Sequence, residues 1–265
     1  MKFRNKVALV TGASRGIGRA IALALAKEGA DVVLNCSTSV KAAEKVSQEI
    51  NRMRRRVMVI QADVSSKSAV ENMIQRVVEE LGKIDILVNN AGMSVVGPSS
   101  ELEEDKWRRG IDVMLTGVFF CSQAAGNEMI KRKSGKIINI ASINGIVAFP
   151  ERACYCAAKA GVMALTKVLG SEWARYNINV NAIAPGYVET ELVRNLATAR
   201  TLDLDELASR IPNGRLARPE EIADLVVFLA SEESKYIQGQ TIIMDGGWTA
   251  YGYVESWLGN RSKEK

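Results

Sequence analysis

The sequence contains no histidine, and this absence removes most of the common catalytic and metal-binding arrangements. Without histidine there is no Ser-His or Cys-His nucleophile pair. The four cysteines, Cys36, Cys121, Cys154 and Cys156, lack the paired C-x-x-C spacing of a zinc site, so we predict no metal site.

Long apolar segments are also missing. No run of 18 apolar residues occurs, and the N-terminus, Met1 to Val10, leads directly into a predicted strand without a signal peptide. We expect no membrane segment and a cytoplasmic location. The cluster of Arg52, Arg54, Arg55 and Arg56 contributes to the net charge of +5, but no nucleic-acid motif accompanies it. We interpret it as a solvated corner and expect no nucleic-acid partner.

Strand-like and helix-like segments alternate along the 265 residues. The predicted strands are Val7–Val10, Asp31–Cys36, Val57–Gln61, Ile84–Val88, Lys136–Ile140, Ile178–Ile183 and Thr241–Met244. The predicted helices are Arg19–Glu28, Val40–Arg52, Lys67–Leu81, Glu101–Lys131, Cys154–Tyr176 and Pro219–Ala230. This order predicts a single α/β domain of the Rossmann type, a doubly wound parallel sheet of about seven strands with helices on both faces.

The stretch from Ser142 to Lys159 holds the first catalytic candidates. Tyr155 and Lys159 are four residues apart in a predicted helix, so their side chains share one face. A nearby ammonium favours the phenolate, and we expect Lys159 to lower the pKa of Tyr155. Ser142 follows a predicted strand, which places its hydroxyl where ligands bind in open α/β sheets. An ordinary surface pair is the alternative interpretation of the Tyr155 and Lys159 spacing.

The segment from Thr11 to Gly18 reads Thr-Gly-Ala-Ser-Arg-Gly-Ile-Gly and joins a strand to a helix. Glycines allow the backbone to approach a diphosphate, and the helix start supplies N–H donors. The spacing G-x-x-x-G-x-G is a variant of the usual dinucleotide motif. We predict that Gly12, Ser14, Arg15, Gly16, Ile17 and Gly18 contact a dinucleotide cofactor.

The end of the second predicted strand bears on the choice between NADP and NAD. NAD-binding proteins commonly place a carboxylate there for the ribose 2′-hydroxyl, and this sequence has Asn35, Cys36, Ser37 and Thr38 instead. Ser37 and Thr38 can donate hydrogen bonds and Arg15 can supply charge, so NADP(H) is favoured over NAD(H). The alternative is that Asn35 or a distant acid binds the ribose.

Together these motifs resemble the short-chain dehydrogenase/reductase family over roughly residues 5 to 248. The resemblance also depends on Asp63, Asn89-Asn90-Ala91-Gly92 and Pro185-Gly186. Within the family, the sequence is most similar to 3-oxoacyl-acyl-carrier-protein reductases, with sugar and polyol dehydrogenases as the alternative. That similarity lies in the glycine segment, in residues 211–216 and in residues 219–222.

The resemblance implies a mechanism in which hydride passes between nicotinamide and a carbonyl or secondary alcohol carbon. Tyr155 is then the general acid or base, Ser142 holds the substrate oxygen, and Lys159 contacts the nicotinamide ribose. Further cofactor contacts implied by the family are Asp63, Val64, Asn90, Ala91, Gly92, Pro185, Gly186, Val188 and Thr190.

One position departs from the family pattern. Where relatives have an asparagine that bends the long helix and holds a water for the proton relay, this chain has Met114. Methionine has no amide for that role. Either backbone groups hold the water and the enzyme stays active, or turnover is severely reduced and the protein mainly binds cofactor. We favour the first hypothesis because Ser142, Tyr155 and Lys159 are all present.

The last third of the sequence contains a predicted lid and an aromatic C-terminal tail. Residues 1–247 are predicted to form the catalytic domain, with a substrate lid at about 190–210. Residues 248–265 contain Trp248, Tyr251, Tyr253 and Trp257, which favours packing on the same domain or on a neighbouring subunit. Stacking on a sugar is the alternative. The expected partners are a small-molecule or acyl-thioester substrate and, by family resemblance, three further copies of the chain in a homotetramer.

Overall fold

A computed structural model of the chain describes residues 1–191, 193, 203–250 and 252. Its centre is a parallel sheet with the strand order β3-β2-β1-β4-β5-β6-β7. The strands are β1 Val7–Val10, β2 Asp31–Cys36, β3 Val57–Gln61, β4 Ile86–Asn89, β5 Gly135–Ile140, β6 Ile178–Pro185 and β7 Thr241–Met244. The predicted doubly wound α/β domain is therefore confirmed.

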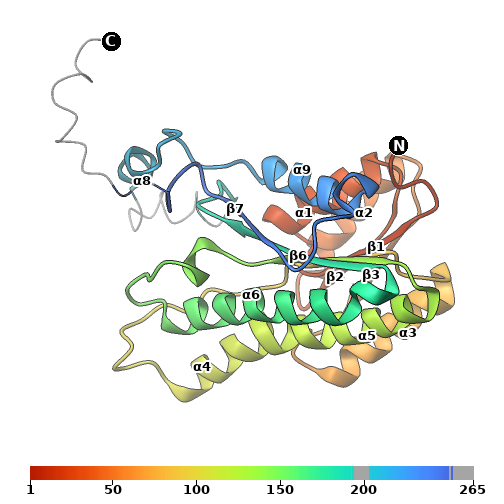
Figure 1. Cartoon of the computed structure of the whole chain (residues 1–265), viewed down its shortest axis with the longest axis horizontal. Helices are drawn as coiled ribbons and strands as arrows, with labels where there is room; N and C mark the ends of the chain where they lie inside the picture. Colours follow the sequence, from red (N-terminus) through yellow and green to blue (C-terminus); the bar gives the residue numbers. More distant parts are fainter. Residues whose placement is uncertain (192, 194–202, 251, 253–265) are drawn as a thin grey trace, which may run out of the picture.

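Helices cover both faces of the sheet (Figure 1). On one face lie α1 Gly16–Lys27, α2 Val40–Arg52 and α9 Pro219–Ala230. On the other face lie α3 Lys67–Leu81, α4 Glu104–Ile111, α5 Gly117–Arg132 and α6 Ala153–Trp173. The short helix α8 Leu204–Arg210 lies beyond the end of the sheet. Among the described residues, no helix is both long and apolar enough to cross a membrane.

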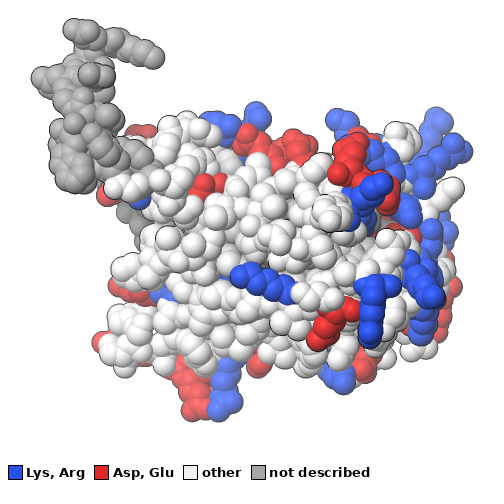
Figure 2. All heavy atoms as spheres, in the orientation of Figure 1, with Lys and Arg blue, Asp and Glu red and all other residues white. Residues whose placement is uncertain are grey.

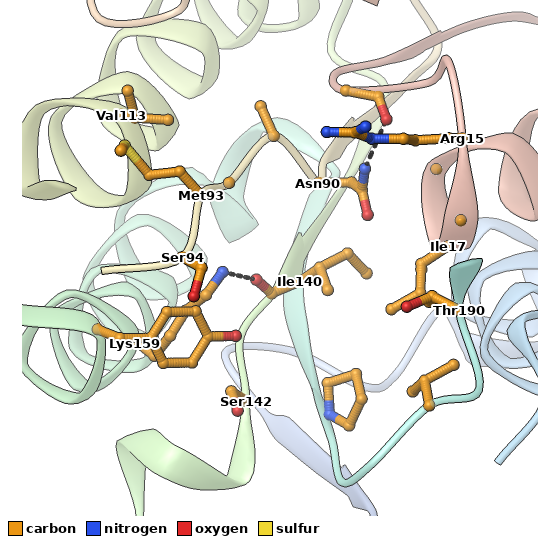
Figure 3. Close-up of a pocket in the computed structure, with 18 of the residues that line it drawn as sticks. Arg15, Ile17, Asn90, Met93, Ser94, Val113, Ile140, Ser142, Lys159 and Thr190 are labelled. Carbon is orange, nitrogen blue, oxygen red and sulfur yellow. Dashed lines mark hydrogen bonds between the residues drawn. The ribbon is translucent and has the colours of Figure 1, made fainter. Parts of the chain in front are cut away.

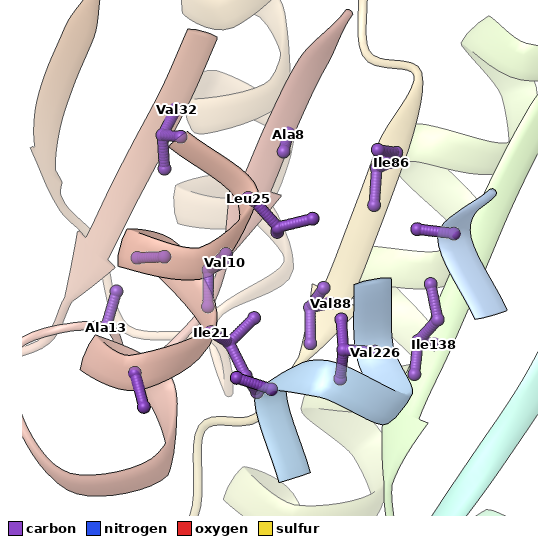
Figure 4. Packing of buried hydrophobic residues seen from close by; sticks show 14 of the residues in the cluster. Ala8, Val10, Ala13, Ile21, Leu25, Val32, Ile86, Val88, Ile138 and Val226 are labelled. Carbon is purple, nitrogen blue, oxygen red and sulfur yellow. The ribbon is translucent and has the colours of Figure 1, made fainter. Parts of the chain in front are cut away.

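Alternating side chains of β1 supply both layers of the core. Ala8 and Val10 face α1 and α9, where Ile21, Leu25 and Val226 pack (Figure 4). Leu9 belongs to the cluster on the opposite face. Because both faces of this strand are buried, its sequence is a continuous apolar run rather than an alternating one.

The long predicted helix from Glu101 to Lys131 is broken in the structure. Between α4 and α5, residues Asp112–Thr116 form a π-helical turn in which the Gly117 amide donates to the Asp112 carbonyl. No proline marks this break, so helical periodicity alone did not reveal it. The other element boundaries differ from prediction by a few residues, including α1, which begins at Gly16 rather than Arg19.

Strand order reverses between β1 and β4, and the chain leaves both strands at the same edge of the sheet. Open α/β sheets bind ligands at this position. At the opposite end, the buried Asp85 lies near Lys6, Lys83 and Arg132, with nitrogen to carboxylate distances of 3.7, 3.2 and 3.3 Å. Lys and Arg side chains gather at that end, near the N-terminus (Figure 2). The edge that can bind a ligand is thus remote from this basic cluster.

Candidate active site

A cavity of about 680 Å³ lies at the carboxyl ends of the strands. We name its two ends by their residues: the glycine-turn end (Gly12–Gly18) and the catalytic end (Ser142, Tyr155 and Lys159). Figure 3 shows Arg15, Ile17 and Asn90 towards one end, with Ser94, Ser142 and Lys159 towards the other. Every site residue predicted from the sequence lines this one cavity.

The glycine turn depends on the absence of side chains at three positions. Gly12 and Gly16 have positive φ angles of 63° and 55°. A Cβ on Gly18 would lie 2.5 Å from Asn90 Nδ2 and would collide with the Gly12 carbonyl oxygen. Asn90 itself is held by Thr11, because its Nδ2 donates to the Thr11 carbonyl at 2.9 Å and its backbone N–H donates to Thr11 Oγ1 at 2.9 Å.

This turn fits a diphosphate. The N-cap residue of α1, Arg15, makes no side-chain capping hydrogen bond, so the first N–H groups of the helix are available to an anion. The chain therefore has the backbone shape and the donors that a dinucleotide cofactor needs.

The end of β2 lines the same cavity. Asn35 is 1% exposed, and its Nδ2 donates to the carbonyls of Ile60 and Ala62 at 3.4 and 3.0 Å. The amide that was the alternative ribose donor is therefore engaged in joining β2 to β3. Ser37 and Thr38 are exposed and line the cavity with Arg15. These three side chains carry the donors at this corner.

Asp63 has a partner that the sequence did not indicate. Its Oδ2 accepts from Arg109 Nη2 at 2.8 Å, while its Oδ1 accepts from the N–H and hydroxyl of Ser65. These hydrogen bonds and the guanidinium charge outweigh the effect of burial and lower the pKa of Asp63. Arg109 lies 46 residues away in α4 and also lines the cavity. Only the fold brings the two together.

At the catalytic end, three elements position the three candidates. Ser142 follows β5 and caps the 3-10 turn Ile143–Gly145, and its Oγ accepts from the Asn144 N–H at 3.2 Å. Tyr155 and Lys159 lie on α6, with Lys159 Nζ 5.7 Å from the centre of the tyrosine ring. Lys159 Nζ donates to the Ile140 carbonyl at 2.7 Å. The surface-pair interpretation is wrong, because Lys159 is only 4% exposed.

The expected direction of the tyrosine shift is also wrong. Burial raises the pKa of Tyr155, and the opposing effects of the Ser142 hydrogen bond and the Arg152 charge do not reverse it. Burial lowers the pKa of Lys159 to about 8. The ammonium is thus directed to a backbone carbonyl and loses charge readily, instead of stabilising a phenolate. At neutral pH Tyr155 is a protonated phenol that can donate a proton.

Met114 lies at the centre of the π-helical turn and is fully buried. Its side chain packs in the apolar cluster beneath the cavity, close to Gly92 and Gly110. The π-helical turn therefore forms with a methionine at the position where the family resemblance led us to expect an asparagine. Backbone carbonyls remain acceptors whatever the side chain at this position.

Aromatic side chains close the substrate side of the cavity. Phe149 and Tyr187 line it with their rings 6.4 Å apart, and Trp248 lies 5.1 Å from Tyr187. The guanidinium of Arg210, at the end of α8, stacks over Trp248 at 4.7 Å. Trp248 thus packs on its own domain, whereas Tyr251, Tyr253, Trp257 and residues 192 and 194–202 of the predicted lid lie outside the described residues.

Several cavity residues were missed by the sequence. They are Met93, Ser94, Arg109, Asn144, Phe149, Arg152 and Tyr187. Most lie within a few residues of a recognised motif, so position after a strand end was the signal available. Arg152 is the clearest case, since it is the N-cap residue of α6, three residues before Tyr155.

Known proteins are similar to this chain over nearly its whole length. A family model described as enoyl-(acyl carrier protein) reductase matches residues 12–249. The 3-oxoacyl-acyl-carrier-protein reductase FabG of Staphylococcus epidermidis is 44% identical over 244 residues, covering 92% of this chain and 98% of that protein.

Two solved structures share the architecture. A putative short-chain alcohol dehydrogenase from Sinorhizobium meliloti has a TM-score of 0.89 at 38% identity, covering 93% of this chain and 97% of that one. A putative gluconate dehydrogenase from Agrobacterium tumefaciens has a TM-score of 0.90 at 37% identity, with coverages of 94% and 98%.

Proposed function

This chain belongs to the short-chain dehydrogenase/reductase family and is an oxidoreductase acting on CH–OH groups with a nicotinamide cofactor, and we propose that it uses NADP(H) to reduce a 3-oxoacyl thioester. One observation carries the proposal. Ser142, Tyr155 and Lys159 gather at one end of a single cavity whose other end is a glycine turn suited to a diphosphate.

The preference for NADP(H) is supported by the corner at β2. Arg15, Ser37 and Thr38 line the cavity there, and residues 35–39 contain no carboxylate. In the described part of the chain, no carboxylate lies within 4 Å of the Arg15 side chain. A guanidinium free of such a partner is suited to a 2′-phosphate.

The protein's own groups would handle the substrate oxygen and its proton. Ser142 would donate its hydroxyl to the carbonyl oxygen, since its Oγ already accepts from Asn144. Tyr155 would give that oxygen its proton, because the raised pKa keeps the phenol protonated at neutral pH. A bound nicotinamide cofactor supplies or accepts the hydride. Lys159 would hold a proton close to the tyrosine, and a pKa of about 8 lets it exchange that proton near neutral pH.

The thioester substrate is supported by the Staphylococcus epidermidis relative, which is named as a 3-oxoacyl-acyl-carrier-protein reductase. An acidic carrier protein could contact the basic residues 131–133. Among the described residues, Lys131 and Arg132 already pair with Glu128 and Asp85, whereas no ion pair involves Lys133. A sugar or polyol dehydrogenase, in which the alcohol is oxidised and NAD(P)⁺ is reduced, is the second candidate. It is supported by the name of the Agrobacterium neighbour and by the rings of Tyr187 and Trp248.

A protein that binds cofactor with little catalysis is the third candidate, motivated by Met114. The intact π-helical turn argues against it, because the bend does not need an asparagine. The homotetramer and the cytoplasmic location stay predictions, and light scattering of the purified chain would test the first.

A substrate comparison with purified protein tests the proposal. NADPH oxidation would be followed with an acetoacetyl thioester, NADH would be used in parallel, and NAD(P)⁺ reduction would be followed with a panel of polyols. We expect the thioester with NADPH to give the highest kcat/KM. Tyr155→Phe should lower kcat by about 10³-fold, because it removes only the proton donor.

Cofactor affinity separates the candidates. Tyr155→Phe should bind NADPH as tightly as the unchanged protein, measured by nicotinamide fluorescence. Faster turnover of a polyol would replace the thioester with the second candidate. Tight NADPH binding without turnover of any compound would favour the third.

A further inference from the structure

Arg152 is a cation at the catalytic end that the proposed proton transfer does not use. It is the N-cap residue of α6, three residues before Tyr155, and its partly buried side chain lines the cavity. Burial raises the pKa of both Tyr155 and Tyr187, and the charge of Arg152 partly opposes that rise. Its guanidinium charge therefore acts on the place where a substrate oxygen would bind.

The partner of Arg152 is a neutral hydroxyl. Its Nη1 donates to Ser94 Oγ at 2.9 Å, and no carboxylate of the described residues lies within 4 Å of it. Arg109, which lines the same cavity, is by contrast paired with Asp63 at 2.8 Å. Arg15, the third arginine of the lining, lies at the glycine-turn end, where the cofactor is expected to supply the anion.

A guanidinium has five N–H donors, and in the part of the chain that the structure describes a single hydroxyl engages one of those of Arg152. Two parallel hydrogen bonds to a carboxylate are the arrangement that best matches the remaining donors. The only other cation at this end is Lys159, among the described residues, and its Nζ is directed to the Ile140 carbonyl. One available positive charge suits a carboxylate better than a phosphate dianion.

Two aromatic rings lie at the same end of the cavity. Phe149 and Tyr187 line the cavity beside Arg152 and present apolar ring surface. A carboxylate held by Arg152 would thus leave the adjoining carbons against the rings and the reacting carbonyl near Ser142 and Tyr155.

We propose that Arg152 binds a free carboxylate of the substrate, so that the enzyme also reduces short oxo acids and oxidises the matching hydroxy acids. This inference rests on the proposed oxidoreductase function but not on the thioester. In the reduction, the carbonyl carbon gains hydride from NADPH and the oxygen gains the Tyr155 proton. The carboxylate is unchanged, and NADPH becomes NADP⁺.

The test compares acetoacetate with ethyl acetoacetate, which carry the same ketone and differ in charge. We expect kcat/KM for acetoacetate to exceed that for the ester by about 10-fold or more, the effect of one charge-assisted pair of hydrogen bonds. Arg152→Gln should lower the value for acetoacetate at least 10-fold, mainly through KM, and change the value for the ester less than about 2-fold. For acetoacetate, kcat/KM of Arg152→Lys should lie between the values of Arg152→Gln and of the unchanged protein.

Arg76→Gln is the matched control, because it removes an exposed arginine on α3 that pairs with Glu80. This variant should leave kcat/KM unchanged for both acetoacetate and its ester. Calorimetry with 3-hydroxybutyrate and its ethyl ester, without cofactor, gives a second readout: Arg152→Gln should weaken only the binding of the acid. NADPH binding would show that the variant is folded.

Two results would overturn the proposal. One is equal kcat/KM for acid and ester in the unchanged protein. The other is an equal loss for both in Arg152→Gln, which would assign Arg152 to the tyrosine or to the Ser94 loop. Both still require turnover of the ester, so they differ from failure of the proposed function, in which no carbonyl compound is reduced.

Discussion

At the glycine-turn end of the cavity, the shape is made by backbone, whereas at the catalytic end it is made by buried side chains. Gly12, Gly16 and Gly18 lie where a Cβ would be strained or would collide with neighbouring groups. Tyr155 and Lys159 instead owe their properties to burial, which shifts the pKa of each towards the neutral form. The first end therefore tolerates little change in shape, and the second little change in polarity.

The difference also appears in how charge is arranged. On the cofactor side of the cavity, Asp63 and Arg109 form an ion pair with 2.8 Å between Oδ2 and Nη2. At the catalytic end, the hydrogen-bond acceptor of Lys159 within the described part of the chain is a backbone carbonyl, and that of Arg152 is a serine hydroxyl. Charges without opposite partners are costly to bury, and they are concentrated here where a ligand would bind.

The largest effect is expected from a change of shape at the glycine-turn end. Gly18→Ala places a methyl group 2.5 Å from Asn90 Nδ2 and against the Gly12 carbonyl, so backbone on one side must move. We expect the free energy of unfolding to fall by about 3 kcal/mol or more, at the upper end of overpacking effects. Urea unfolding measures this, and NADPH affinity should fall with it.

The matched control is Gly82→Ala at the end of α3, where nothing lies within 4 Å of the added carbon but φ is 82°. That variant carries the cost of backbone strain without a clash and should keep normal NADPH affinity. Equal losses of NADPH affinity in both variants would mean that the turn at Gly18 is not special.

The second effect tests burial at the catalytic end. The pKa of Lys159 is about 8 in the folded chain, against 10.5 for an ordinary lysine. Between these pH values the unfolded chain binds more protons, so burial of this amine destabilises the fold fully below pH 8 and progressively less as pH rises. Relative to Lys159→Met, the unchanged protein should gain about 2–3 kcal/mol of stability between pH 7 and pH 10.5.

Comparing two proteins at each pH removes the effect of other groups. Cys121, for example, has a pKa raised by burial to about 12 and costs stability at alkaline pH in both. Lys131→Met is the matched control, because it removes an exposed amine on α5 outside the cavity. A difference that is constant for Lys159→Met would show that the amine is not desolvated.

The sequence predicted the glycine-turn end more fully than the catalytic end, for a physical reason. The turn is one contiguous segment, and its conformation requires glycine at fixed spacing, so the requirement is visible in the residues themselves. The spacing of Tyr155 and Lys159 likewise placed both on one face of a helix. The order of strands and helices was predicted because each buried strand is a short apolar run between turns.

What the sequence did not predict depends on segments that meet only in the folded chain. The pKa of Tyr155 was expected to fall because Lys159 was visible in the sequence, while burial was not. The pairing of Asp63 with Arg109 joins residues 46 positions apart. The aromatic side chains of Phe149, Tyr187 and Trp248 come from three separate segments that meet only in the folded chain.

The smallest change in stability is expected at Met114. A substitution there tests whether the catalytic end needs a polar side chain beneath it. Met114→Asn puts an amide into a fully buried apolar position, which should lower the free energy of unfolding by about 1–2 kcal/mol. Because the π-helical turn already forms with methionine, we expect kcat and its pH profile to stay within about 3-fold. Met114→Leu, which keeps the position apolar, should change both quantities less. An increase in kcat above 10-fold in Met114→Asn, but not in Met114→Leu, would contradict this. It would show that the unchanged protein lacks an amide that the proton relay needs, and that backbone groups do not replace it.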